Sequence, residues 1–302
     1  MAAAEISLER LREVFDRSRY LAPLNEIVLT GGEPFLRKDF KDLYRYFRER
    51  FPRARITVIT NGLLIKSDFL VTEQDVGSTV LVFSLDGLEK TNDLVRGIGG
   101  SFKRVLAAVE FYRSHFPILK MGLSFTIMPD NFQDLRAVYE IARKLGIGFT
   151  MRFAGSSATF YGPPEHQLLW QEEILDRIEE DVRWVVRDLS RSRNWLNRWL
   201  NPDLTFFSKM VAYQRHPQRL VRCFAGTDSA FIDAYGNVYP CIFIGTALGN
   251  LKDSDFDDIW LSEGAAAQRR LIAAEKCHCW TECETLPALQ RRLAHLALKG
   301  KK

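Results

Sequence analysis

The stretch from Glu26 to Arg37, EIVLTGGEPFLR, contains residue types whose spacing suits ligand binding. A short apolar run is followed directly by Gly31, Gly32, Glu33 and Pro34. Glycines let a backbone approach a ligand closely, and a carboxylate can accept a charge-assisted hydrogen bond from an ammonium group. Taken alone, the same four residues also fit an ordinary connection between a strand and a helix.

The cysteines are the second group of residues that could do chemistry. All five lie between Cys223 and Cys283, and three of them fall in the segment CHCWTEC. An odd number of cysteines, in a chain whose N-terminus shows no secretion-signal pattern, disfavours a disulfide framework and favours thiolates around a metal or cluster. Four thiolates fit an iron–sulfur cluster and equally fit tetrahedral zinc, so the tail alone leaves both open.

Short apolar runs alternating with amphipathic segments must position these groups. The apolar runs lie at 26–30, 55–60, 79–85, 121–128 and 148–153, and the helical patterns follow Ser7 and lie near 39–51, 66–75, 102–115 and 131–145. Strands that are apolar on both faces and alternate with helices predict a parallel sheet covered by helices. We therefore expect an α/β fold, either a barrel or an open doubly wound sheet.

Polar residues collect where the predicted strands end, which is where ligands bind in such folds. Besides the Gly31–Pro34 turn, these residues are Thr60, Asn61, Ser84, Asp86 and Arg152. We expect them to share one rim of the sheet.

The rest of the chain predicts helices from Pro164 to about Leu200, a hairpin in AFIDAYGNVYPC, a helix over 255–276 and a basic C-terminal helix. Trp184, Trp195 and Trp199 alternate with arginines there, and we interpret them as helix packing rather than a nucleic-acid surface. We divide the chain into a partial barrel at 1–160, a helical linker region at 161–221 and a cysteine-rich module at 222–302.

Composition limits the classes of partner. With 302 residues, of which 46% are hydrophobic, the chain can bury a large core. Its net charge of +4 is spread along the sequence and indicates neither nucleic acid nor a membrane surface as a partner. No apolar run reaches the roughly 20 residues that span a bilayer, so we expect a cytoplasmic protein.

The order and spacing of these strand ends resemble the radical S-adenosylmethionine (SAM) superfamily. In that family a GGEP turn follows the second strand of a partial (β/α)6 TIM-like barrel and binds the methionine amino group. The resemblance implies that Gly31, Gly32 and Pro34 shape the turn and that Glu33 accepts a hydrogen bond from the ligand ammonium. It also implies that the strand-end residues Thr60, Asn61, Ser84 and Asp86 face the ribose or the methionine carboxylate, with Arg152 at the same rim. The segment DLVRGIGGSF resembles a stretch of peptide-modifying members, which adds Arg96 and Ser101.

The tail resembles the SPASM or twitch auxiliary-cluster domain of the same superfamily. Cys223 is followed after twelve residues by Gly236 and after four more by Cys241, as in the opening of that domain. The segment CHCWTEC resembles its closing part. The resemblance implies one auxiliary 4Fe–4S cluster on Cys223, Cys241, Cys279 and Cys283, with Cys277 as the alternative fourth ligand and zinc as the alternative metal.

The chain departs from the family in one respect. The family cleaves SAM at a 4Fe–4S cluster held by a C-x-x-x-C-x-x-C loop after the first barrel strand, whereas thirty residues precede Gly31 and none is cysteine. We expect a truncated or misassigned start rather than a degenerate enzyme, because Glu33, Asn61 and Asp86 are retained. The cluster is then expected only in a longer parent, the first strand is missing, and the chain as given is inactive. The edge at 26–30 needs a partner to cover it.

The resemblance predicts an enzyme that uses a 5′-deoxyadenosyl radical to modify a peptide or a small molecule, and peptides are the substrates most often paired with such tails. Two alternatives stay open. One is a non-catalytic zinc or iron–sulfur binding module, and the other is a different α/β-barrel enzyme with a structural zinc tail.

Overall fold

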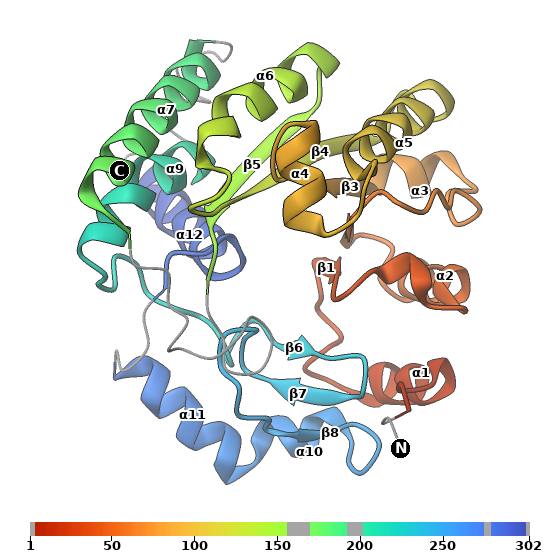
Figure 1. Cartoon of the computed structure of the whole chain (residues 1–302). Coiled ribbons are helices and arrows are strands. Elements are labelled where there is room, and N and C mark those ends of the chain that lie inside the picture. Colours follow the sequence, from red (N-terminus) through yellow and green to blue (C-terminus); the bar gives the residue numbers. More distant parts are fainter. Residues whose placement is uncertain (1–3, 156–169, 192–201, 275–278, 300–302) are drawn as a thin grey trace.

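The computed structural model describes residues 4–155, 170–191, 202–274 and 279–299 (Figure 1). Its larger sheet has five parallel strands whose order in space is their order in the sequence. The strands are β1 (Glu26–Leu29), β2 (Arg55–Thr60), β3 (Thr79–Ser84), β4 (Lys120–Ile127) and β5 (Gly148–Phe153). The predicted α/β fold, a partial TIM-like barrel followed by a small α+β module, is confirmed.

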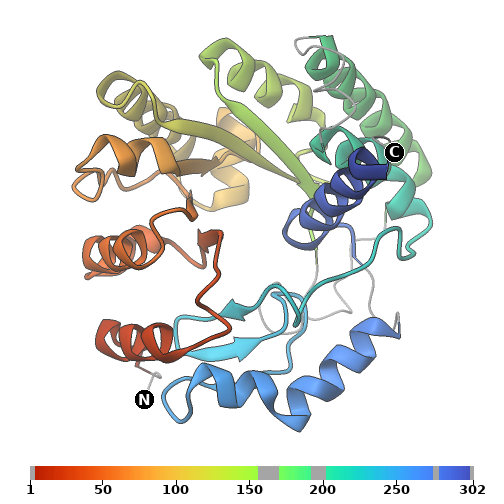
Figure 2. The same cartoon turned by 180° about the vertical axis from the view of Figure 1, so that it is seen from behind.

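Helices in the connections cover the outer side of the sheet (Figures 1 and 2). They bury large side chains against it, including Tyr44, Tyr112 and Val138. The connecting elements are the 3₁₀ helix η1 (Pro34–Leu36), α2 (Phe40–Arg50), α3 (Glu73–Ser78), α4 (Glu89–Arg96), α5 (Ser101–His115), η2 (Phe132–Asp134) and α6 (Leu135–Leu145). The strands fit the predicted runs to within one residue at each end, because continuous apolar runs are the signal of a sheet covered on both faces.

Two helix predictions were wrong in part, and a short helix was missed. The segment 66–72 is not helical, because Thr72 and Asp75 form a capping box that starts α3 at Glu73. The short helix α4 was not predicted. The expected single helix over 255–276 is divided at Ser262 into α10 (Phe256–Leu261) and α11 (Glu263–Ala273), because the Ser262 hydroxyl caps the second of them.

The C-terminal part consists of helices and a three-stranded antiparallel sheet. The predicted hairpin is confirmed, with β6 (Phe231–Ile232) and β7 (Asn237–Tyr239) joined through Gly236 at φ 89°. The remaining elements are α7 (Glu172–Arg191), α9 (Pro202–Arg215), β8 (Gly249–Asn250) and α12 (Glu282–Lys299). Helix α9 contacts both β5 and α12, so the last helix returns to the edge of the large sheet.

The tryptophan-rich region is described only in part. Trp184 packs edge-on against Tyr139 with ring centroids 5.7 Å apart, and the Arg136 guanidinium lies 4.5 Å from its ring. This confirms the packing interpretation for Trp184, while Trp195 and Trp199 lie outside the described residues.

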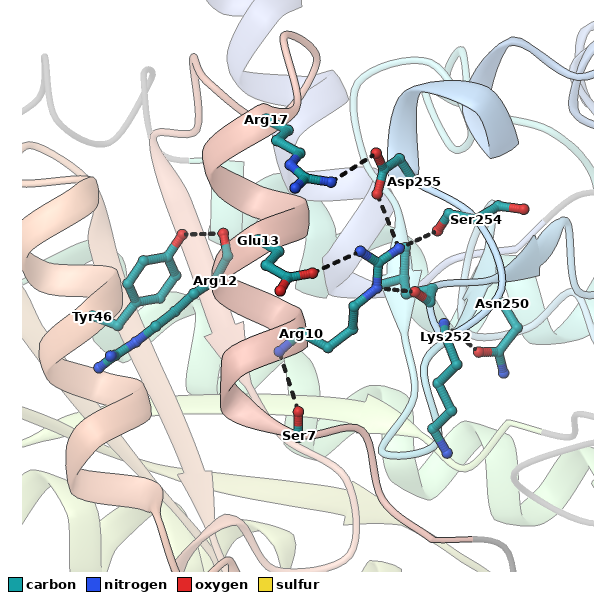
Figure 3. A network of polar contacts seen from close by, with 11 residues as sticks. Ser7, Arg10, Arg12, Glu13, Arg17, Tyr46, Asn250, Lys252, Ser254 and Asp255 are labelled. Carbon is teal, nitrogen blue, oxygen red and sulfur yellow. Dashed lines mark hydrogen bonds and ion pairs between the residues drawn. The ribbon is translucent and has the colours of Figure 1, made fainter.

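Helix α1 (Leu8–Arg17), which Ser7 caps as the pattern predicted, attaches to the C-terminal module (Figure 3). Arg10 donates from Nε to the Leu251 carbonyl at 2.7 Å and from Nη2 to Asp255 at 2.9 Å. The Ile6 backbone N–H donates to the Ala234 carbonyl at 2.8 Å. The module with β6–β8, α10 and α11 therefore lies beside α1, as both views show.

Strand β1 forms an edge of the large sheet. Within the described residues it pairs only with β2, and Val28 is 47% exposed. The other four strands each contain fully buried side chains. None of the helices in the described part of the chain combines the length and apolar character that crossing a bilayer would require.

Candidate active site

The turn after β1 presents its backbone to open space. Gly31 adopts φ 134°, a conformation that favours glycine, and a Cβ built on either Gly31 or Gly32 would meet no atom within 4 Å. Pro34 then begins η1, and Glu33 precedes it as the N-cap. The two glycines thus leave room for a ligand directly beside the Glu33 carboxylate.

Glu33 is bound firmly to the end of the neighbouring strand. Its Oε1 accepts from Phe35 N at 3.2 Å and from the Thr60 hydroxyl at 2.8 Å, and its Oε2 accepts from Asn61 N at 2.7 Å. A carboxylate has about four acceptor positions, so one on Oε2 is left for a donor from a ligand. The carboxylate is therefore fixed at the carboxyl ends of β1 and β2.

Thr60 and Asn61 lie behind Glu33. Thr60 is 2% exposed, and its hydroxyl also accepts from Gly62 N at 3.1 Å. The Asn61 amide oxygen accepts from Leu63 N at 2.9 Å. The described contacts of both residues hold the turn in shape, while Ser84 is partly exposed at the end of β3.

Asp86 is buried, at 3% exposure, and both of its oxygens are in use. Its Oδ1 accepts from Thr126 N at 2.8 Å, and its Oδ2 forms an ion pair with Arg96 Nη2 at 2.5 Å. Burial raises the pKa of Asp86, although the Arg96 charge and the Thr126 hydrogen bond oppose that rise. Asp86 therefore supports Arg96 and has little surface left for a ligand of its own.

Two asparagines that sequence reasoning missed complete this support. Asn92 Oδ1 accepts from Asp86 N at 2.8 Å, and its Nδ2 donates to the Ser101 hydroxyl at 2.8 Å. Asn131 Nδ2 donates to the Asp86 carbonyl at 2.9 Å. Asn92 and Asn131 are fully buried, and Ser101 is 2% exposed, so all three lie beneath the rim. Nothing in their local sequence distinguishes them from ordinary loop and cap residues.

Arg152 connects the rim to the cysteine-bearing tail. Its Nη1 forms an ion pair with Glu282 at 2.6 Å, and the Thr150 hydroxyl donates to the same carboxylate. Glu282 begins α12, between Cys279 and Cys283. Burial raises the pKa of Asp86, and the positive charge of Arg152, like that of Arg96, opposes the rise, so Arg152 acts on both regions.

Four of the five predicted cysteine ligands are described, and they gather near the start of α12. Cys241 is 6% exposed and its sulfur accepts from Phe243 N at 3.2 Å. Burial raises the pKa of the Cys241 thiol, and the nearby Cys283, Glu284 and Cys279 raise it further. The Thr281 hydroxyl lies 3.4 Å from the Cys279 sulfur and 3.3 Å from the Cys283 sulfur.

Glu284 shares the region with the thiols. It is 7% exposed, accepts from the Ser229 hydroxyl at 2.7 Å, and lies 4.0 Å from the Cys223 sulfur. Burial raises its pKa to about 7, against the effect of the Ser229 hydrogen bond. This carboxyl group was not among the predicted site residues.

The donor set fits an iron–sulfur cluster in its chemistry, because thiols and a backbone N–H directed at sulfur are what such clusters use. Within the described residues, however, no three cysteine, histidine or acidic side chains are placed to hold a metal ion. Cys277 lies outside the described residues. The thiols are thus brought near one another without forming a closed site.

Comparison with known families gives two matches. Residues 2–145 match the model of the radical SAM superfamily, and residues 223–284 match that of an iron–sulfur cluster-binding domain, SPASM.

Individual relatives cover most of the chain at low identity. AdoMet-dependent heme synthase of Methanosarcina barkeri is 26% identical, over 83% of this chain and 71% of that protein. Pre-heme d1 synthase of Dinoroseobacter shibae is 29% identical, over 85% of this chain and 66% of that protein.

Among solved structures, Streptococcus suis SuiB bound to S-adenosylmethionine has a TM-score of 0.61 at 16% identity, covering 87% of this chain and 60% of that one. Another SuiB structure, at 15% identity, is bound to the precursor peptide SuiA. Identity this low shows a shared fold, and the chain spans less than two thirds of SuiB.

Proposed function

The chain belongs to the radical SAM superfamily and carries a SPASM domain, and from this premise we propose that its rim binds S-adenosylmethionine. Glu33 accepts a hydrogen bond from the methionine ammonium at the free position of Oε2. Gly31 and Gly32 let the backbone approach the ligand. Arg96, held by Asp86 with about a third of its side chain exposed, binds the methionine carboxylate. The observation that carries the proposal is the Glu33 carboxylate fixed at the rim with one acceptor position open.

The chain's own residues do not fit the cluster that cleaves this cofactor. Residues 1–222 contain no cysteine, so the strand-end loops of the large sheet supply no thiolate for that cluster. Members of the superfamily generate a 5′-deoxyadenosyl radical from bound S-adenosylmethionine. We propose that this chain binds S-adenosylmethionine without cleaving it.

The C-terminal thiols hold the auxiliary metal. Cys223, Cys241, Cys279 and Cys283 supply four sulfur ligands, with Cys277 as the alternative, and Phe243 N–H stabilises the charge on the Cys241 sulfur. Anaerobic purification followed by iron, sulfide and zinc analysis distinguishes the metals. About four irons with matching sulfide support a 4Fe–4S cluster, whereas one zinc without sulfide supports a structural zinc site.

The substrate class proposed from the relatives is a tetrapyrrole-type small molecule, because both curated relatives compared above are named as synthases of heme compounds. A peptide is the second candidate, since SuiB is recorded with a precursor peptide. The relatives support both substrate classes, and a basic pocket lined by Lys38, Lys41 and Lys66 favours the tetrapyrrole-type molecule.

Calorimetric titration with S-adenosylmethionine tests the proposed function. Glu33→Gln keeps the shape of the side chain but removes its charge, so affinity falls about tenfold to a hundredfold. Glu49→Gln is the matched control, because Glu49 is exposed on α2. Equal affinities for Glu33→Gln and the control, in proteins with unchanged circular dichroism, would exclude Glu33 from the binding site.

A further inference from the structure

A basic pocket lies next to the rim and is not used by the proposed cofactor site. Its volume is about 420 Å³, and its walls come from the start of α2 and from the loop that follows β2. These two segments continue directly from the Gly31–Pro34 turn and from the Thr60–Gly62 turn. The pocket is lined by Lys38, Lys41, Ile65, Lys66, Ser67 and Asp68.

Positive charge dominates the lining. Three ammonium groups face one carboxylate, that of Asp68, which pairs with Lys41 at 3.5 Å. Within the described residues, no acid lies at ion-pair distance from Lys38 or Lys66. Two cations are therefore available for an anion.

The pocket is held in shape from both sides. Phe69 is fully buried and packs against Phe35, Phe40 and Tyr44, with ring centroids 4.8–5.8 Å apart. On the other side, Lys66 N donates to the Tyr112 hydroxyl at 3.1 Å. A loop fixed at both points keeps Lys66 near one place, which lowers the entropy cost of binding.

Charged groups of the pocket and of the rim both act on the hydroxyl group of Tyr112. Burial raises the pKa of Tyr112, and the charges of Glu33 and Asp68 raise it further, whereas the hydrogen bond from the Lys66 backbone N–H opposes the rise. The Tyr112 hydroxyl is thus close enough to respond to the rim carboxylate and to the pocket carboxylate.

We propose that this pocket binds an oxyanion group of the substrate, a carboxylate or a phosphate, beside the S-adenosylmethionine rim. The link to a substrate rests on the proposed function, whereas anion binding by the pocket does not. A substrate with peripheral carboxylates would place one of them between Lys38 and Lys66.

Isothermal titration with citrate and, separately, with inorganic phosphate at low ionic strength tests the pocket directly. The double variant Lys38→Gln/Lys66→Gln should weaken binding of the preferred anion about tenfold or more. The control Lys120→Gln/Lys144→Gln removes the same charge from exposed sites on β4 and α6 and should change affinity less than about twofold. Tighter citrate assigns a carboxylate, and tighter phosphate assigns a phosphorylated substrate.

A third variant gives the opposite expectation. Asp68→Asn removes the competing carboxylate and releases Lys41, so the preferred anion should bind about threefold more tightly. The proposal is overturned if neither anion binds the wild-type chain, if both double variants lose affinity equally, or if Asp68→Asn weakens binding. If the pocket fails these tests but the same preparation binds S-adenosylmethionine normally, the proposed function stands. If the preparation binds citrate but does not bind S-adenosylmethionine, the proposed function alone is rejected.

Discussion

Glu33 and Asp86, the two carboxylates at the rim, have different roles, and the degree of burial of each side chain distinguishes these roles. Asp86 is 3% exposed and uses both oxygens inside the protein. Glu33 is only partly buried, and within the described residues its Oε2 has one hydrogen-bond donor, which leaves one acceptor position. The resemblance to the radical SAM superfamily placed both on the ligand. The partners of Asp86 come from β4 and α4, and only the fold brings them together.

At the residue scale, Asp86 acts through Arg96, and Asp86→Asn tests this. Losing the ion pair lets the guanidinium move, so affinity for S-adenosylmethionine falls about tenfold. Affinity for decarboxylated S-adenosylmethionine changes less than about twofold, because that ligand lacks the group Arg96 binds. Both values come from titration calorimetry.

Asp130→Asn is the control, because Asp130 is exposed in the loop after β4. If Asp86→Asn weakens both ligands equally, Asp86 supports the rim as a whole rather than the contact between Arg96 and the carboxylate.

At the element scale, the contact between β5 and α12 positions the cysteine-bearing segment. The Glu282 side chain is 17% exposed and binds both Arg152 and Thr150. Glu282→Gln removes a partly buried charged pair, which lowers the free energy of unfolding by about 1–3 kcal/mol. We also expect less metal per chain after anaerobic reconstitution, measured by plasma emission spectroscopy.

Glu263→Gln is the matched control, because the Glu263 side chain is 82% exposed in its pair with Arg270. Full metal loading in Glu282→Gln, equal to that of the control, would show that this contact does not organise the thiols.

The contact between α1 and α10 predicts a pH dependence. Asp257 accepts from the Ser18 hydroxyl at 2.5 Å and from Arg19 N at 3.2 Å. Burial alone would raise the pKa of Asp257, but these hydrogen bonds outweigh it and lower the pKa below the ordinary 3.8. The contribution to stability is present above pH 3.8 and disappears as the pH falls through the lowered pKa.

Asp257→Asn should therefore lower the free energy of unfolding by about 1–3 kcal/mol at neutral pH. The difference from wild type should shrink below pH 3.8. Urea unfolding at several pH values measures both. A difference that stays constant down to pH 2 would exclude Asp257 as the titrating group.

Elements differ in how far the sequence could predict them. The five strands were predictable because each is one continuous apolar run. Helix α4 was not predictable from the sequence, because it is short and because its Leu94 side chain is 74% exposed rather than buried. The loop at 66–72 resembles a helix in its apolar spacing, and only the Thr72 capping box shows where α3 begins. That loop carries half of the basic pocket, so the pocket was not predictable either.

At the scale of the whole molecule, the first and the last helix attach to different parts of the structure. Helix α1 contacts the module through Arg10, and α12 returns to the edge of the large sheet through α9 (Figures 1 and 3). The spacing of Cys223 and Cys241 around Gly236 predicted the module. Its attachment to α1 could not be predicted, because the donors and acceptors involved lie more than 200 residues apart.

A crystal structure of this chain with S-adenosylmethionine tests the proposed rim site most directly. We expect the methionine ammonium within about 3 Å of Glu33 Oε2, beside Gly31 and Gly32, with the carboxylate directed at Arg96. A ligand bound elsewhere, with the Glu33 carboxylate still facing solvent at that position, would contradict the assignment.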